Sequence, residues 1–196
     1  MIKIALIIGS TRPNRFADVP AQWILDGAKS RADFTTETLD LRDHPLTFFA
    51  EPISPAFSGG VFSSPAAEAW RHKIGGYDGF IILAAEYNHG PTAVLKNALD
   101  SAFLEWQNKP VGFVGYGGVG GARAVEQLRL NAIELQMAPI RNAVHIGIEP
   151  FLGVLQQNRS LDSYEYLNQS RTAMFDQLVW WAKALKAARA QLANVG

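Results

Sequence analysis

The chain has 196 residues, of which 48% are hydrophobic and 18% charged, so we predict a single folded domain over 1–196 and exclude a disordered segment. Its 18 basic and 18 acidic side chains balance, which predicts neither a nucleic-acid partner nor a membrane-surface partner. The absence of cysteine excludes disulfides, thiolate catalysis and cysteine-ligated metals. The first apolar run, 2–8, is too short for a signal peptide or a membrane span, so we expect a cytoplasmic protein.

Strand and helix patterns alternate along the chain. Apolar runs typical of strands buried on both faces lie at 1–8, 79–84 and 110–114. Residues 34–41 alternate as an edge strand does, and 143–148 is predicted as the fifth strand. Helices are predicted at about 17–32, 65–75, 92–103, from the glycine-rich turn to about 137, and from 161 onward.

This alternation predicts right-handed parallel crossovers and an open α/β sheet with helices on both faces. Five strands with the first one central favour the flavodoxin-like order 2-1-3-4-5. In such sheets the ligand lies beyond the carboxyl ends of the strands. We therefore expect the functional residues in the loops that follow the first, third and fourth strands.

One segment, 42–64, breaks the alternation. It contains three prolines, a glycine pair and four phenylalanines (Phe48, Phe49, Phe57 and Phe62). An irregular loop of this length inside a compact domain is usually functional, so we interpret it as lining the site. The alternative is a surface loop that packs its own aromatic side chains.

The loop after the first strand, 9–15, reads Gly-Ser-Thr-Arg-Pro-Asn-Arg. Hydroxyls, an amide and two guanidinium groups at the start of a helix favour an anion, because backbone amides and the helix dipole add positive potential there. Arginine binds phosphate with two parallel hydrogen bonds. There is no Gly-Lys-Ser/Thr, which argues against a nucleoside-triphosphate loop. The alternative is a polar turn that caps the helix.

The loops after the third and fourth strands, 84–91 and 115–121, suit a flat heterocycle. The first offers tyrosine, asparagine and small residues, and the second is rich in glycine. The second loop matches the dinucleotide-binding fingerprint G-x-G-x-x-G. That fingerprint also requires an acidic residue about 20 residues later, at the end of the next strand. Here that distance reaches Glu134, which falls in a predicted helix, so we reject the dinucleotide interpretation. The four histidines have no metal-ligand spacing, so we predict no metal site.

Together these loops resemble the NAD(P)H-dependent FMN reductase family, a flavodoxin-like group that includes quinone, azo and chromate reductases. The resemblance covers about 2–185. It depends on the phosphate-loop motif 9–15, on Glu-Tyr-Asn-His-Gly-Pro at 86–91 followed by Leu-Lys-Asn-Ala-Leu-Asp at 95–100, and on the glycine loop 117–124. The chain departs from the family at 84–85, where Ala-Ala replaces a common Thr-Pro.

The resemblance implies FMN as cofactor and NAD(P)H as cosubstrate. It implies that the FMN phosphate is held by Ser10, Arg12, Asn14 and Arg15. It places Glu86, Tyr87, Asn88 and His89 on one side of the isoalloxazine and Tyr116, Gly117 and Gly118 on another, and Phe16 completes the predicted cofactor-binding set. It also implies a homodimer or homotetramer with the helix 92–103 at the interface.

The function expected from these features is hydride transfer from NAD(P)H through FMN to a flat small-molecule acceptor, such as free flavin or a quinone, in a ping-pong cycle. The cofactor supplies the chemistry, so no catalytic side chain is assigned. A one-electron carrier of the same fold is typically strongly acidic, and this chain has no net charge. A cofactor-free hydrolase or transferase needs a nucleophile–base pair, and the chain has no G-x-S-x-G and no cysteine.

Overall fold

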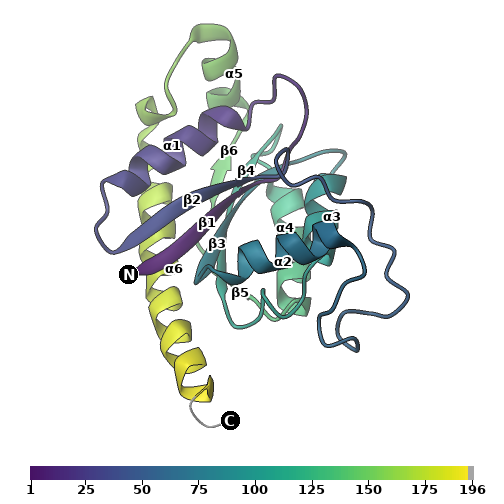
Figure 1. Ribbon diagram of the computed structural model, residues 1–196. Coiled ribbons are helices and arrows are strands. Elements are labelled where there is room, and N and C mark those ends of the chain that lie inside the picture. The colour runs from purple at the N-terminus through teal and green to yellow at the C-terminus, as the bar shows by residue number, and fades with distance from the viewer. Residues whose placement is uncertain (194–196) are drawn as a thin grey trace.

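The computed structural model describes residues 1–193, which form a parallel sheet in the predicted order. The strands run β2-β1-β3-β4-β5, and a further short strand, β6, also pairs with β4. This confirms the flavodoxin-like α/β fold (Figure 1). The strands are β1 (Ile2–Ile8), β2 (Phe34–Asp40), β3 (Gly79–Ala85), β4 (Pro110–Tyr116), β5 (Ala138–Pro139) and β6 (Val144–Ile146).

Helices cover both faces of the sheet. Helices α1 and α6 pack on one face and α2, α3 and α4 on the other (Figure 1). The bounds are α1 (Asp18–Lys29), α2 (Pro65–Gly75), α3 (Ala93–Asp100), α4 (Ala122–Glu134), α5 (Ile148–Gln157) and α6 (Glu165–Ala193), with a 3-10 turn at Leu161–Ser163. None of the helices within 1–193 is long and apolar enough to cross a bilayer.

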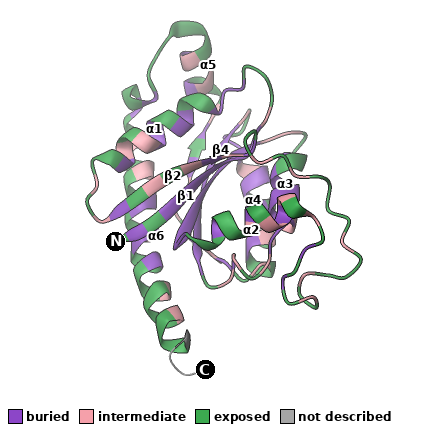
Figure 2. Cartoon of the chain, viewed as in Figure 1, coloured by how far each residue is buried: buried purple, intermediate pink, exposed green. Residues whose placement is uncertain are grey.

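The core consists of two apolar layers separated by the sheet. Because successive side chains of a strand point to opposite faces, β1 supplies Ile4 and Leu6 to the layer under α1 and α6, and Ala5 and Ile7 to the layer under α2, α3 and α4. The central strands are almost wholly buried, whereas the edge strand β2 alternates (Figure 2). This packing fixes where the strands end, and therefore where their loops meet.

The structure differs from the predicted elements at the last edge of the sheet. The predicted strand 143–148 is only Val144–Ile146, because Gly147 and Ile148 begin α5, which the sequence analysis did not predict. The strand β5 pairs with the start of β4, at Pro110 and Val111, and β6 pairs with the end of β4, at Val114–Tyr116. Helix α4 ends at Glu134 and not at 137, because Gln136 adopts a left-handed conformation with φ 58°.

Candidate functional site

A cavity of about 290 Å³ lies where the loops after β1, β3 and β4 meet, as predicted from the strand order. Most of the residues predicted to bind the cofactor line it: Ser10, Arg12, Asn14, Arg15, Phe16, Glu86, Tyr87, Tyr116 and Gly117. The other lining residues are Ala85, Phe151 and Leu155. Asn88, His89 and Gly118 lie in the same loops but do not line the cavity.

The loop after β1 packs closely against β3 at Gly9, whose backbone amide donates to the Leu83 carbonyl at 2.9 Å. A Cβ atom on Gly9 would lie 2.8 Å from the carbonyl oxygen of Leu83, so only glycine fits without a shift. The hydroxyl of Thr92 donates to the Gly9 carbonyl and also caps α3. Next in the loop, Ser10 Oγ lies 3.1 Å from the Tyr87 hydroxyl. The loops after β1 and β3 are thus joined at the cavity.

Arg12 is the cationic side chain that this arrangement leaves available. Its guanidinium lies 5.9 Å from the centroid of the Tyr87 ring, and within 1–193 it forms no ion pair. The helix that follows, α1, has no side-chain cap at its N-terminus, whereas hydroxyls of Ser64 and Thr92 cap α2 and α3. A guanidinium without a carboxylate partner favours a bound anion, and the predicted polar-turn alternative lacks its side-chain cap on α1.

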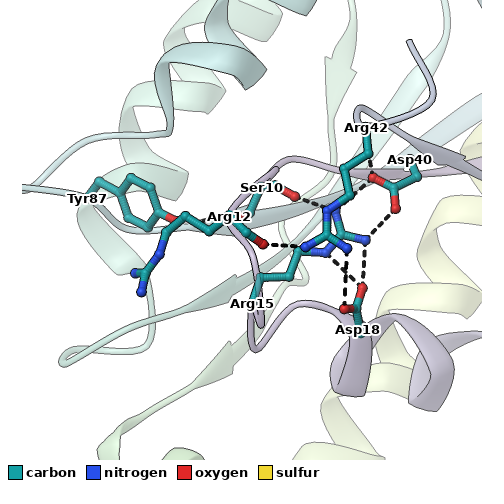
Figure 3. Close-up of polar contacts among 7 residues, drawn as sticks. All are labelled: Ser10, Arg12, Arg15, Asp18, Asp40, Arg42 and Tyr87. Carbon is teal, nitrogen blue, oxygen red and sulfur yellow. Dashed lines mark hydrogen bonds and ion pairs between the residues drawn. The ribbon is translucent and has the colours of Figure 1, made fainter. Parts of the chain in front are cut away.

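Arg15 has a different environment although it lines the same cavity. Its side chain is 3% exposed and donates to Asp40 Oδ1 at 2.7 Å and to Asp18 Oδ1 at 2.8 Å. It also donates to the Ser10 carbonyl. Figure 3 shows this cluster and, apart from it, the Arg12 guanidinium alongside the Tyr87 ring. The guanidinium of Arg15 therefore already has protein partners on its donors.

The loop after β3 is fixed to the start of α4 by Glu86. This carboxylate accepts hydrogen bonds from the Arg123 backbone amide at 3.0 Å and from Arg123 Nε at 2.7 Å. Although burial favours the neutral acid, these bonds hold the pKa of Glu86 below its usual value, so the group stays ionised at neutral pH. The loop then turns through Asn88 and His89, both at positive φ, and His89 Nε2 lies 2.8 Å from Arg123 Nη1.

The glycine loop after β4 contributes one position to the cavity, Gly117. Its φ of 149° disfavours any other residue, and a Cβ there would lie 3.2 Å from Glu86 Cβ. Gly118 has no positive φ and open space around it, so the prediction that backbone at Gly118 closely approaches a ligand has no support from its conformation. Glu134 is the last residue of α4, which agrees with our rejection of the dinucleotide fingerprint.

Aromatic side chains form the other wall. Phe16 packs on Tyr116 with ring centroids 5.3 Å apart and on Phe151 at 4.5 Å. Burial raises the pKa of Tyr116 to about 12, so its hydroxyl is neutral at neutral pH. Phe151 and Leu155 come from α5 and were missed by sequence reasoning. The apolar spacing of Ile148, Phe151 and Leu155 was the available signal for this helix.

The irregular segment 42–64 does not line this cavity. The prediction that it lines the site is therefore wrong for the cavity that a single chain forms. It runs beside α2 and α3 (Figure 1) and lines two other cavities. One, of about 490 Å³, includes Arg42, Phe48 and Thr11, and the other, of about 110 Å³, includes Phe62. It is attached to α3 through the Phe49 amide, which donates to Asn97, and to α2 through the Phe62 amide, which donates to Glu68.

Comparisons with known proteins agree with the fold and the loops. The family model described as NADPH-dependent FMN reductase matches residues 2–150. An NAD(P)H-dependent FMN reductase of Schizosaccharomyces pombe is 38% identical over 144 residues, 72% of each chain. An NADPH:quinone oxidoreductase of Arabidopsis thaliana is 30% identical over 142 residues, 70% of this chain and 69% of the other.

Among solved structures, the flavoenzyme NAD(P)H:(acceptor) oxidoreductase FerB of Paracoccus denitrificans superposes with a TM-score of 0.73, covering 94% of this chain and 98% of that one. Its sequence identity is 17%, so it supports the fold alone. The family match covers the loops after β1, β3 and β4 that build the cavity. The chain therefore belongs to the NADPH-dependent FMN reductase family and is an oxidoreductase that uses FMN and NAD(P)H.

Proposed function

We propose that the cavity at the ends of β1, β3 and β4 is the FMN site, and that the enzyme passes reducing equivalents from NAD(P)H to a flat acceptor such as free flavin or a quinone in a ping-pong cycle. The observation that carries this proposal is the convergence of three loops on one cavity. Its lining combines the Arg12 guanidinium with the aromatic rings of Phe16, Tyr87 and Tyr116.

The lining of the cavity fits a phosphate joined to a planar ring. The guanidinium of Arg12, the hydroxyl of Ser10 and the side-chain amide of Asn14 offer charge and donors to the phosphate. Tyr87, Tyr116 and the backbone at Gly117 offer flat surfaces and a close approach to the ring. Small-molecule sites of this kind combine an apolar lining with a few convergent polar groups.

Bound FMN would supply the hydride-transfer chemistry, and the lining of the cavity, including Arg12, Tyr87 and Tyr116, would hold it. The chain's own side chains then have binding and orienting roles. Glu86 is held ionised by Arg123 and fixes the relative position of two loops, so we assign it no proton transfer. Within 1–193 the cavity lining holds no cysteine and no histidine beside its hydroxyls, which disfavours the hydrolase alternative.

The direct test is an absorption spectrum of the purified protein followed by FMN titration and steady-state kinetics. We expect a flavin spectrum or saturable quenching of FMN fluorescence, NAD(P)H oxidation with quinone or free flavin, and parallel double-reciprocal plots. A colourless protein that leaves FMN fluorescence unquenched would overturn the site. Intersecting plots would leave the site intact and contradict the ping-pong order.

We also propose that the enzyme is a homodimer or homotetramer that uses the surface formed by 42–64 and α3. This surface exposes large apolar side chains, which in a soluble protein mark interaction sites: Phe48, Phe57, Val61 and Val94. Light scattering coupled to size-exclusion chromatography gives the subunit number. A monomer at micromolar concentration would contradict the proposal. The cytoplasmic location predicted from the sequence is tested by cell fractionation.

A further inference from the structure

Three arginines surround the phosphate loop, and they differ in how their charge is used. Arg15 is buried against Asp40 and Asp18. Arg42, just after β2, lies 3.8 Å from Asp18 and forms a hydrogen bond with its backbone amide to Asp40 Oδ1 at 3.0 Å. Two arginines and two aspartates thus neutralise one another. Arg12 is outside this cluster (Figure 3).

Asp40 connects the members of the cluster. It is the last residue of β2 and pairs in register with Ile8 of β1, so it lies at the edge of the sheet where the phosphate loop begins. Both of its oxygens accept from the Arg15 guanidinium, and one of them also accepts from the Arg42 amide. Its side chain is 18% exposed. Although burial favours the neutral acid, the Arg15 pairing holds the pKa of Asp40 below its usual value.

Arg15 and Arg42 each also donate a hydrogen bond from the guanidinium to a backbone carbonyl of the phosphate loop. Arg15 donates to the carbonyl of Ser10, and Arg42 donates to the carbonyl of Arg12. These two bonds turn two carbonyl oxygens toward the cluster, which lies on the other side of the loop from the Tyr87 ring (Figure 3). Carbonyl oxygens that pointed into the cavity would repel a phosphate. The cluster therefore fixes the part of the loop that carries Arg12.

We propose that Asp40 is a positioning residue which, acting through Arg15 and Arg42, holds the phosphate loop in its anion-binding form and so sets the preference for FMN over its unphosphorylated analogue riboflavin. This inference rests on the proposed FMN site and extends it to residues outside the cavity. Arg12 is the arginine that meets the phosphate. Arg15, predicted from the sequence as a phosphate ligand, acts on the loop and not on the ligand.

The sign of the effect separates positioning from simple electrostatics. Asp40→Asn keeps the shape of the side chain and removes its negative charge. Removal of a nearby negative charge would by itself tighten the binding of an anion. Loss of the fixed loop weakens it, because the phosphate then has to order the loop. We expect the dissociation constant of FMN to rise about tenfold and that of riboflavin to change less than about threefold.

A matched control lies at the opposite end of β2. Asp33 forms two hydrogen bonds with Arg31, at 3.0 and 2.8 Å, far from the cavity. Asp33→Asn removes a comparable arginine–aspartate pair, and we expect it to leave both dissociation constants unchanged. A second variant, Arg42→Lys, keeps the positive charge and the Asp40–Arg15 pair and removes the guanidinium that bonds to the Arg12 carbonyl. This variant should raise the dissociation constant of FMN, but not that of riboflavin, by a smaller factor than Asp40→Asn does. It replaces Asp40→Asn as the test if that variant does not fold.

Titration of each variant with FMN and with riboflavin decides between the outcomes. A selective loss of FMN affinity in Asp40→Asn and Arg42→Lys, absent in Asp33→Asn, is the expected result. Unchanged or tighter FMN binding, or equal weakening of both flavins, would overturn the positioning role while the FMN site stands. Failure of the wild-type protein to bind FMN would instead overturn the site, and the positioning role with it.

Discussion

Two irregular segments, the phosphate loop 9–16 and the segment 42–64, differ in how the chain fixes them. The phosphate loop is short and polar, yet Ser10, Arg15 and Phe16 in it are buried. The segment 42–64 is longer and rich in phenylalanine, yet Phe48 and Phe57 are 79% and 87% exposed. The polar composition of the loop 9–16 therefore does not make it exposed, and the phenylalanines of 42–64 do not make that segment buried.

The difference follows from the partners that each segment finds. The phosphate loop lies between two strand ends and satisfies its backbone through Arg15 and Arg42. The segment 42–64 is attached at a few points, such as Asn97, which accepts from the Phe49 amide at 2.8 Å and donates to the Thr47 carbonyl at 2.9 Å. A loop at the end of a central strand has neighbouring strands on both sides to contact, whereas one that leaves an edge strand has a neighbouring strand on one side only.

The largest effect is expected at Arg12. Arg12→Ala should weaken FMN by about 1.5–3 kcal/mol, the scale of a charge-assisted hydrogen bond. Riboflavin, which lacks the phosphate, should bind the variant and the wild type almost equally. Fluorescence titration with both flavins measures this difference. Equal weakening of the two flavins would mean that Arg12 serves the fold, and the phosphate loop would then resemble 42–64 in having no ligand role.

A somewhat smaller effect is expected in the glycine loop. Gly117→Val introduces a branched side chain at φ 149° and close to Glu86, which costs about 1–3 kcal/mol of strain and should lower FMN content. Gly118→Val, in open space at an ordinary φ, is the matched control and should retain FMN. If Gly117→Val keeps its FMN and raises only the KM of the nicotinamide, the loop cradles a dinucleotide and we rejected that fingerprint wrongly.

The sequence predicted the sheet and the three loops because each depends on local signals. Apolar runs mark β1, β3 and β4, and the strand order then brings 9–16, 84–87 and 116–117 together. The ion pair of Arg15 with Asp40 was beyond such reasoning, because the two residues are 25 positions apart. Asp40 does, however, lie at the end of a predicted strand, where a search for a counter-charge would have found it.

The contribution of α5 was missed for another reason. Its residues follow a predicted strand without a clear turn signal, so Ile148 was assigned to the strand and Phe151 to no element. The segment 42–64 was misplaced because composition marks a loop as unusual without saying which surface it covers. Only the packing of Asn97 and of the buried Phe62 shows that it lies against α3 and α2.

Acid should loosen the phosphate loop through Asp40. Its pKa in the folded protein is below the ordinary 3.8, so the unfolded chain binds more protons between those two values. The stabilisation, about 1 kcal/mol, is therefore full above about pH 5 and is lost as the pH falls through the folded pKa. Denaturant unfolding of the wild type and of Asp40→Asn should show a difference at pH 7 that shrinks as the pH falls below the ordinary pKa of 3.8. A difference that does not change with pH would mean that Asp40 acts through packing and not through charge.

The smallest effect on stability is expected in 42–64, at Phe57. Because its ring is 87% exposed, Phe57→Ser should change the free energy of unfolding of one chain by no more than about 0.5 kcal/mol. If a second copy covers this surface, the same change should raise the dissociation constant of the dimer and leave FMN affinity per chain unaltered. Trp180→Ala, at an exposed aromatic side chain of α6 on the opposite face of the sheet, is the control and should leave the dimer intact. Light scattering over a dilution series measures both variants. Loss of the dimer in Trp180→Ala but not in Phe57→Ser would move the interface to α6, and 42–64 would then be a surface loop whose exposed rings bind no second subunit.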